Sequence, residues 1–110
     1  MRPPIIAVDS SGDVLIFDSV QSAERYLEPI DVLHGEYVIY DARGCELTAS
    51  LAPRGRGITI AEREPARRRQ PELRQHLIAF LAAAGEDEDS LEGLSLEELV
   101  ALGQRKYPTR

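Results

Sequence analysis

The first sixty residues show short apolar runs separated by turn residues, a pattern that predicts a β-sheet. Residues 5–8 and 14–17 are almost continuously apolar, which is typical of strands covered on both faces. Asp, Ser and Gly join these two runs, so we expect a hairpin. Residues 37–40 predict a third strand, and the strict alternation over 45–51 predicts a half-buried fourth strand. Residues 58–61 predict a fifth strand at an edge of the sheet.

Apolar residues at helical spacing predict three helices. The first is capped by Ser19 and ends at Pro29, because the residue before proline avoids the helical conformation. The second covers 71–84 and carries one apolar stripe. The last opens on a capping box formed by Ser95 and Glu98.

The predicted order is β-β-α-β-β-β-α-α, which indicates an α+β fold: a mostly antiparallel sheet of four to five strands with helices covering it. A chain of 110 residues is the size of one domain, so we expect a single domain over 1–110. Two segments lack apolar periodicity. We interpret 62–70 as an Arg-rich solvated linker and 86–94 as an acidic connector.

The charge alternates along the chain. The net charge is −6, yet residues 51–75 hold seven arginines against three acids. A negative protein is repelled by nucleic acid and by anionic membranes and favours basic partners. The apolar run near the start is too short for a signal peptide or a membrane span. We therefore expect a cytoplasmic protein with no membrane partner, and twelve arginines against one lysine are typical of a GC-rich bacterial genome.

Residues that could carry chemistry are few and scattered. Cys45 is the only cysteine, and with His34 and His76 it does not match a metal-ligand spacing. Asp9 and Asp13 flank a turn, where aspartate is favoured for its side-chain hydrogen bonds. We place His76 half-buried on the apolar stripe of its helix and His34 in a surface loop. We expect no catalytic residues, no metal, no cofactor and no enzymatic activity.

Two charged surfaces are candidates for binding a partner. Acidic side chains that could dock onto a basic protein are Glu86, Asp87, Glu88, Asp89 and Glu92. An alternative basic patch comprises Arg54, Arg56, Arg67, Arg68 and Arg69. The net negative charge and the lack of interleaved aromatics argue against nucleic acid as its partner. The edge strand at 58–61 leaves two further options open, pairing with a second copy or strand addition to another protein.

Residues 12–47 carry a resemblance to a known group of proteins. The matching elements are an apolar run after Gly-Asp, then FDS at 17–19, AERYLEP at 23–29, GEY at 35–37 and DARG at 41–44. This pattern resembles small bacterial immunity proteins of polymorphic toxin systems, of the contact-dependent inhibition or type VI secretion kind. The resemblance implies a non-catalytic inhibitor that binds a cognate toxin domain, often a nuclease, and occludes its active site. It does not specify the toxin's chemistry, because the basic stretch 54–74 departs from the acidic character of a nuclease inhibitor.

A second interpretation belongs to another functional class. The protein would be a small regulatory or adaptor domain whose Arg-rich segment binds nucleic acid or an acidic protein.

Overall fold

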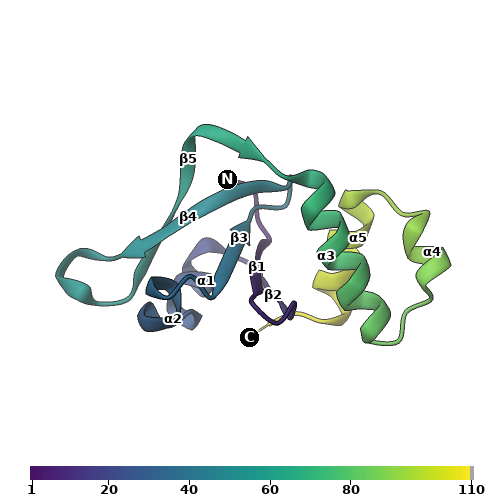
Figure 1. Cartoon of the computed structure of the whole chain (residues 1–110), viewed down its shortest axis with the longest axis horizontal. Coiled ribbons are helices and arrows are strands. Elements are labelled where there is room, and N and C mark those ends of the chain that lie inside the picture. Colours follow the sequence, from purple (N-terminus) through teal and green to yellow (C-terminus); the bar gives the residue numbers. More distant parts are fainter. Residues whose placement is uncertain (110) are drawn as a thin grey trace.

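The sheet has five antiparallel strands in the spatial order β2-β1-β3-β4-β5 in the computed structural model, which describes residues 1–109 (Figure 1). The strands are β1 Ile5–Asp9, β2 Val14–Phe17, β3 Tyr37–Tyr40, β4 Cys45–Leu51 and β5 Ile58–Arg68. Neighbouring strands pair antiparallel throughout. The predicted α+β class with an antiparallel sheet is confirmed.

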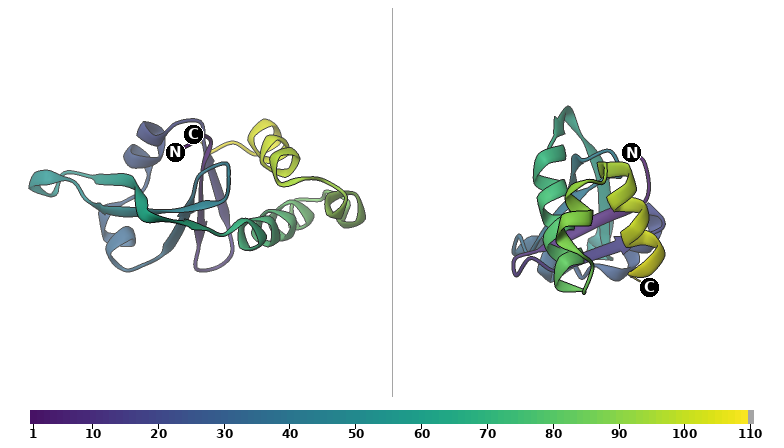
Figure 2. Two further views of the ribbon diagram at one scale, coloured as in Figure 1. Left: turned by 90° about the horizontal axis from the view of Figure 1, so that it is seen from above. Right: turned by 90° about the vertical axis from the view of Figure 1, so that its right-hand side faces the viewer.

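Helices cover both faces of this sheet. Their bounds are α1 Val20–Tyr26, α2 Pro29–Leu33, α3 Gln70–Ala83, α4 Glu88–Glu92 and α5 Leu96–Lys106, with a 3₁₀ turn at Pro53–Gly55. Helices α3, α4 and α5 gather at one end of the molecule's 47 Å axis, whereas the β4–β5 hairpin extends from the other (Figure 2).

Two apolar clusters lie on opposite faces of the sheet. In β1, Ile5 and Ala7 pack with the cluster under α1, whereas Ile6 and Val8 pack with the cluster under α3 and α5. Successive side chains of a strand point to opposite faces, so a strand buried on both sides needs apolar residues at every position. This explains the continuous apolar runs and confirms the prediction made from them.

The first helix ends before Pro29, as predicted, and Glu28 is extended with φ −80° and ψ 136°, but Pro29 also opens a second helix that the sequence did not predict. Helix α1 ends at Tyr26, and Leu27 is extended with φ −73° and ψ 128°. Pro29 then occupies the first turn of α2, where its missing N–H costs nothing. The proline therefore lies between two short helices, after the end of the first and at the start of the second.

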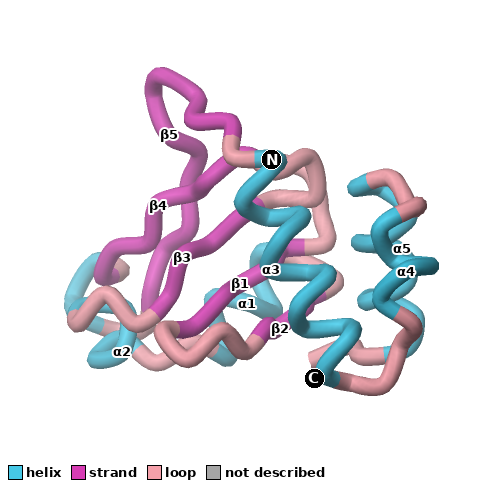
Figure 3. Tube along the Cα trace, turned by 45° about the vertical axis from the view of Figure 1, so that its right-hand side comes forward, coloured by secondary structure: helices cyan, strands magenta, loops and turns pink. Residues whose placement is uncertain are grey.

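The expectation of a linker at 62–70 is wrong. Strand β5 runs to Arg68: Glu62 pairs with Leu47 and Arg67 pairs with Glu46. Four residues, 63–66, therefore bulge out of register, and β5 arches away from β4 (Figure 3). Pairing between backbones needs no apolar side chains, so a strand exposed on both faces leaves no periodic pattern to read.

Strand β5 lies at the edge of the sheet, as predicted. One of its backbone amides that does not pair with β4 is already hydrogen-bonded: the Ile60 N–H donates to Glu24 Oε2 at 2.8 Å. The opposite edge is also covered at one point, where the Thr109 N–H donates to the Ile16 carbonyl of β2 at 2.8 Å.

The acidic connector predicted at 86–94 contains the short helix α4. Asp87 caps it by accepting from the Ser90 N–H at 3.0 Å. Leu91 is its one buried side chain and packs with the cluster under α3 and α5. A single apolar anchor among carboxylates is too little for a periodicity argument, which is why the sequence did not predict this helix.

Among residues 1–109, none of the helices has the length and apolar character needed to cross a membrane.

Candidate functional site

The predicted acidic surface is brought together around α4, at the end of the molecule farthest from the β4–β5 hairpin (Figure 1). Two of its five carboxylates are engaged within the fold. Glu86 accepts from Lys106 Nζ at 2.9 Å, and hydrogen bonds from Ser90 hold the pKa of Asp87 below its ordinary value. The other three carboxylates form neither an ion pair nor a hydrogen bond within residues 1–109: those of Glu88, Asp89 and Glu92.

The predicted basic patch does not form one surface. Arg54 and Arg56 lie in the β4–β5 connection, whereas Arg67, Arg68 and Arg69 lie at the other end of β5, before α3 (Figure 1). Proximity in sequence misled here because the intervening residues form an extended strand.

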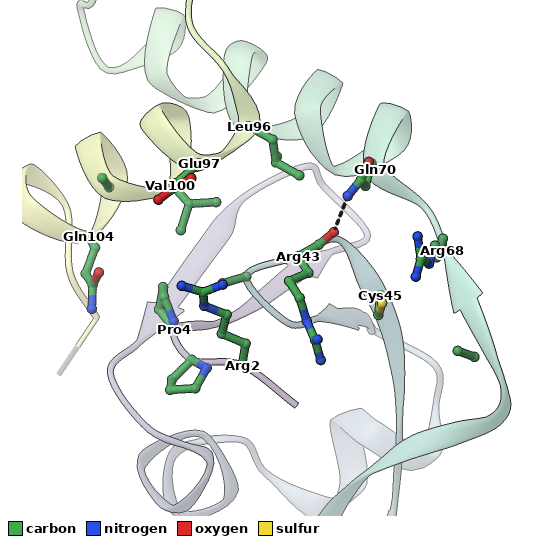
Figure 4. A pocket seen from close by; sticks show the side chains of 14 residues that line it. Arg2, Pro4, Arg43, Cys45, Arg68, Gln70, Leu96, Glu97, Val100 and Gln104 are labelled. Atoms are coloured by element: carbon green, nitrogen blue, oxygen red, sulfur yellow. Dashed lines mark hydrogen bonds between the residues drawn. The ribbon is translucent and has the colours of Figure 1, made fainter.

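Arg68 instead joins two arginines distant in sequence, Arg2 and Arg43, in a groove of about 580 Å³ (Figure 4). The groove lies between the segment preceding β1, the β3–β4 turn, the β5–α3 junction and helix α5. Sequence analysis missed it because no local pattern relates residues that only the folded chain brings together.

Asp41 organises two walls of the groove. Its side chain is 1% exposed and accepts backbone N–H groups from Arg2 at 3.1 Å, Arg43 at 3.0 Å and Cys45 at 3.0 Å. The Ala42 N–H also donates to the Arg2 carbonyl at 2.8 Å. The carboxylate thus joins the first residues of the chain to the β3–β4 turn and fixes where the Arg2 and Arg43 side chains begin.

The third wall is held by Gly44 and Gln70. The Gly44 carbonyl accepts from the Arg69 N–H at 2.7 Å, and Gln70 Nε2 donates to the Arg43 carbonyl at 2.8 Å. Gly44 has φ +84°, a left-handed conformation that glycine adopts without steric cost. This turn therefore holds the arginine-bearing end of β5 against the β3–β4 turn.

The groove is positively charged in an otherwise acidic protein. Within residues 1–109, the guanidinium groups of Arg2 and Arg68 have no ion pair, and Arg43 Nη2 lies 3.5 Å from Asp41 Oδ2. Glu97 is the one carboxylate that lines the groove. Guanidinium forks match carboxylate and phosphate oxygens, so this arrangement is suited to holding an anion.

Cys45 is half-buried and lines the same groove. The alternation over 45–51 predicts it on the buried face of the strand together with Leu47, and this expectation is wrong because the register shift between Glu46 and Leu47 breaks the alternation. In the described part of the chain, no three side chains of His, Cys, Asp or Glu are grouped as metal ligands.

The most exposed large apolar side chains in residues 1–109 lie on α2. Ile30 is 57% exposed and Leu33 is 64% exposed, and residues three apart share one face of a helix. Burial raises the pKa of Tyr37, and the charge of Asp31 raises it further, followed by smaller effects that include Glu36. We call Ile30, Asp31, Leu33 and Glu36 the α2 surface: an apolar centre beside carboxylates. The sequence does not predict this surface, because a proline that follows a helix is typical of the start of a loop, whereas here it begins α2.

Asp9, His76 and His34 have the structural roles predicted for them. Asp9 Oδ1 accepts from the Ser11 N–H at 2.9 Å, the Ser11 hydroxyl at 2.7 Å and the Asp13 N–H at 2.9 Å. His76 is half-buried on α3, with its ring centroid 6.5 Å from that of Tyr40. His34 is exposed at the end of α2.

The Asp9 turn makes the protein sensitive to acid. The hydrogen bond from the Ser11 hydroxyl, with further backbone bonds, lowers the pKa of Asp9 below 3.8. A lowered folded-state pKa adds stability above the unfolded value, and this stability is lost as the pH falls through the folded pKa. We expect the free energy of unfolding to drop less between about pH 6 and about pH 3 in Asp9→Asn than in the wild type. Urea unfolding followed by circular dichroism measures this.

Asp13→Asn is the matched control, because the Asp13 carboxylate accepts no hydrogen bond from residues 1–109. Equal pH dependence of the wild type and Asp9→Asn would contradict the assignment.

Comparison with known proteins adds no family to this picture: no protein-family model, no curated protein and no solved structure matches the chain.

Proposed function

We propose that the protein is a non-catalytic inhibitor that binds a cognate bacterial toxin domain and occludes its active site, with the α2 surface at the centre of the contact. The observation that carries this proposal is the exposure of Ile30 and Leu33 on one face of α2. Both residues lie inside the segment 12–47, whose sequence resembles immunity proteins. Exposed apolar groups beside charges are typical of protein–protein contacts.

The α2 surface is better suited to the central contact than the acidic surface around α4. The two lie toward opposite ends of the long axis (Figure 1), so one compact partner engages one of them. Buried apolar anchors supply most of the energy of a typical interface, whereas exposed ion pairs contribute little. The carboxylates of Asp31 and Glu36 select a partner that is basic around its own apolar site.

The α2 surface is also held in place before binding. Val32, between the two exposed residues, packs against the apolar cluster under α1. A surface that is already ordered loses little conformational entropy on association. Occlusion then requires only that the toxin domain present its active site to this surface.

Substitution of the two anchors tests the proposal. We expect Ile30→Asp and Leu33→Asp each to weaken binding to the toxin domain encoded by the neighbouring gene by about 30-fold or more, because truncated or desolvated anchors cost about 2 kcal/mol or more. Both side chains are exposed, so the thermal midpoint should stay close to that of the wild type. Surface plasmon resonance gives both rate constants, and the loss should appear mainly in faster dissociation.

Two controls locate the contact. Val38→Asp changes an exposed apolar residue on the opposite face of the sheet, where Val38 pairs with Val8. A triple variant, Glu88→Lys, Asp89→Lys and Glu92→Lys, reverses the free carboxylates of α4. Both should bind like the wild type. Slower association of the triple variant with unchanged Leu33→Asp would place the contact at the acidic surface, and failure of the wild type to bind would contradict the function.

A further inference from the structure

We propose that the groove between the segment preceding β1 and α5 binds a small phosphate-bearing molecule, whose phosphate is held by Arg2, Arg43 and Arg68. This binding site is separate from the α2 surface and does not depend on the proposed toxin partner. Three segments far apart in sequence each contribute one arginine (Figure 4). The three arginines therefore come from different parts of the chain and line one groove, instead of belonging to a single charged run.

The charge of the groove matches a phosphate better than a single carboxylate. Three arginines and one acidic residue, Glu97, line the groove. A phosphate monoester carries about −1.5 to −2 charges near pH 7. Arg43 is partly neutralised by Asp41 at 3.5 Å, whereas Arg2 and Arg68 have no ion pair within residues 1–109. The two unpaired arginines therefore supply most of the attraction.

An apolar side of the groove accommodates the rest of the ligand. Pro4 and Val100 are buried and Leu96 is half-buried, and all three line the groove. A volume of about 580 Å³ lies within the range of about 300–1,000 Å³ found for small-molecule sites. The ligand class is thus a compact phosphate monoester with an apolar body.

The site is assembled before a ligand arrives. Asp41 holds the backbone amides of Arg2 and Arg43, and Gln70 Nε2 bonds the Arg43 carbonyl at 2.8 Å. These bonds order the backbone from which the Arg2 and Arg43 side chains extend, so that part of the site loses little backbone entropy when an anion binds.

Calorimetric titration of the isolated protein tests the assignment with phenyl phosphate as the probe and phenol as its neutral counterpart. We expect phenyl phosphate to bind at least about tenfold more tightly than phenol, because hydrogen bonds to charged groups are the stronger ones. The single cysteine gives a second readout. Phenyl phosphate should slow alkylation of Cys45 by iodoacetamide, an uncharged reagent, and phenol at the same concentration should not.

The variant Arg2→Gln with Arg68→Gln should weaken phenyl phosphate binding by at least about tenfold and remove the protection of Cys45. Its matched control, Arg54→Gln with Arg56→Gln, changes net charge equally at the other end of β5 and should bind like the wild type. Circular dichroism checks that both variants fold.

Equal binding of phenyl phosphate and phenol, or full binding by the Arg2 and Arg68 variant, would overturn the proposal. A short single-stranded DNA that binds this groove more tightly than phenyl phosphate would also overturn it, in favour of a nucleic-acid site. These measurements use no toxin domain, so their failure leaves the proposed inhibitor function standing, and failure of that function leaves this site standing.

Discussion

Replacing Asp41 with alanine is expected to lower the free energy of unfolding by about 3 kcal/mol, because three backbone N–H groups lose their acceptor at about 1 kcal/mol each. The donors are Arg2, Arg43 and Cys45, and the carboxylate that serves them is almost fully buried. No other side chain connects the start of the chain to the β3–β4 turn in this way within the described residues. Urea denaturation followed by circular dichroism measures the loss.

Asp41→Asn fills the same space as aspartate but cannot accept all three hydrogen bonds. It therefore separates the contribution of the hydrogen bonds from that of packing. One oxygen, Oδ1, accepts from both Arg43 and Cys45, while Oδ2 accepts from Arg2. An asparagine can keep the first pair through its carbonyl oxygen and loses the third bond. We therefore expect it to cost about half as much as alanine or less. Equal destabilisation by the two substitutions would show that the hydrogen bonds are not what Asp41 contributes.

Replacing Gly44 with alanine should destabilise the fold by about 3 kcal/mol, the sum of a left-handed backbone and a steric clash. A Cβ at this position would lie 2.8 Å from Gln70 Cγ and 3.0 Å from Gln70 Cα. The side-chain atom can move, but the Cα belongs to the first turn of α3. The substitution therefore pushes the β5–α3 junction away from the β3–β4 turn.

Gly12→Ala is the control for Gly44→Ala, because it shares the backbone cost without the clash. Gly12 has φ +90° and no atom within 4 Å of a built Cβ, so we expect a loss of about 1–2 kcal/mol. A loss at Gly44 no larger than that at Gly12 would mean that the junction can relax freely around Gln70.

The sheet could be predicted because the burial of its side chains requires a recognisable pattern of apolar residues in most strands. Continuous runs mark β1 and β2, and turn residues separate them. The capping box of α5 was also readable, and it is confirmed: the Glu98 N–H donates to Ser95 Oγ at 3.1 Å and the Ser95 N–H donates to Glu98 Oε1 at 3.0 Å. Local side-chain chemistry of this kind depends on residues only three positions apart.

The features that could not be predicted depend on the backbone or on tertiary proximity. The outer half of β5 is held by pairing to Glu46 and Cys45 without buried apolar side chains, so its sequence looks like a linker. The groove depends on Asp41, which the sequence analysis includes only as the first residue of DARG at 41–44. Nothing along the chain indicates that its carboxylate reaches back to Arg2.

A free strand edge is a template on which further chains can polymerise, and natural sheets interrupt such templates. In β5 the Glu24 carboxylate accepts a hydrogen bond from the Ile60 N–H, and residues 63–66 do not pair with β4. An incoming backbone would have to displace a charged acceptor and then lose its register within a few residues. The molecule can therefore carry a long exposed strand without offering a continuous seed for fibril growth.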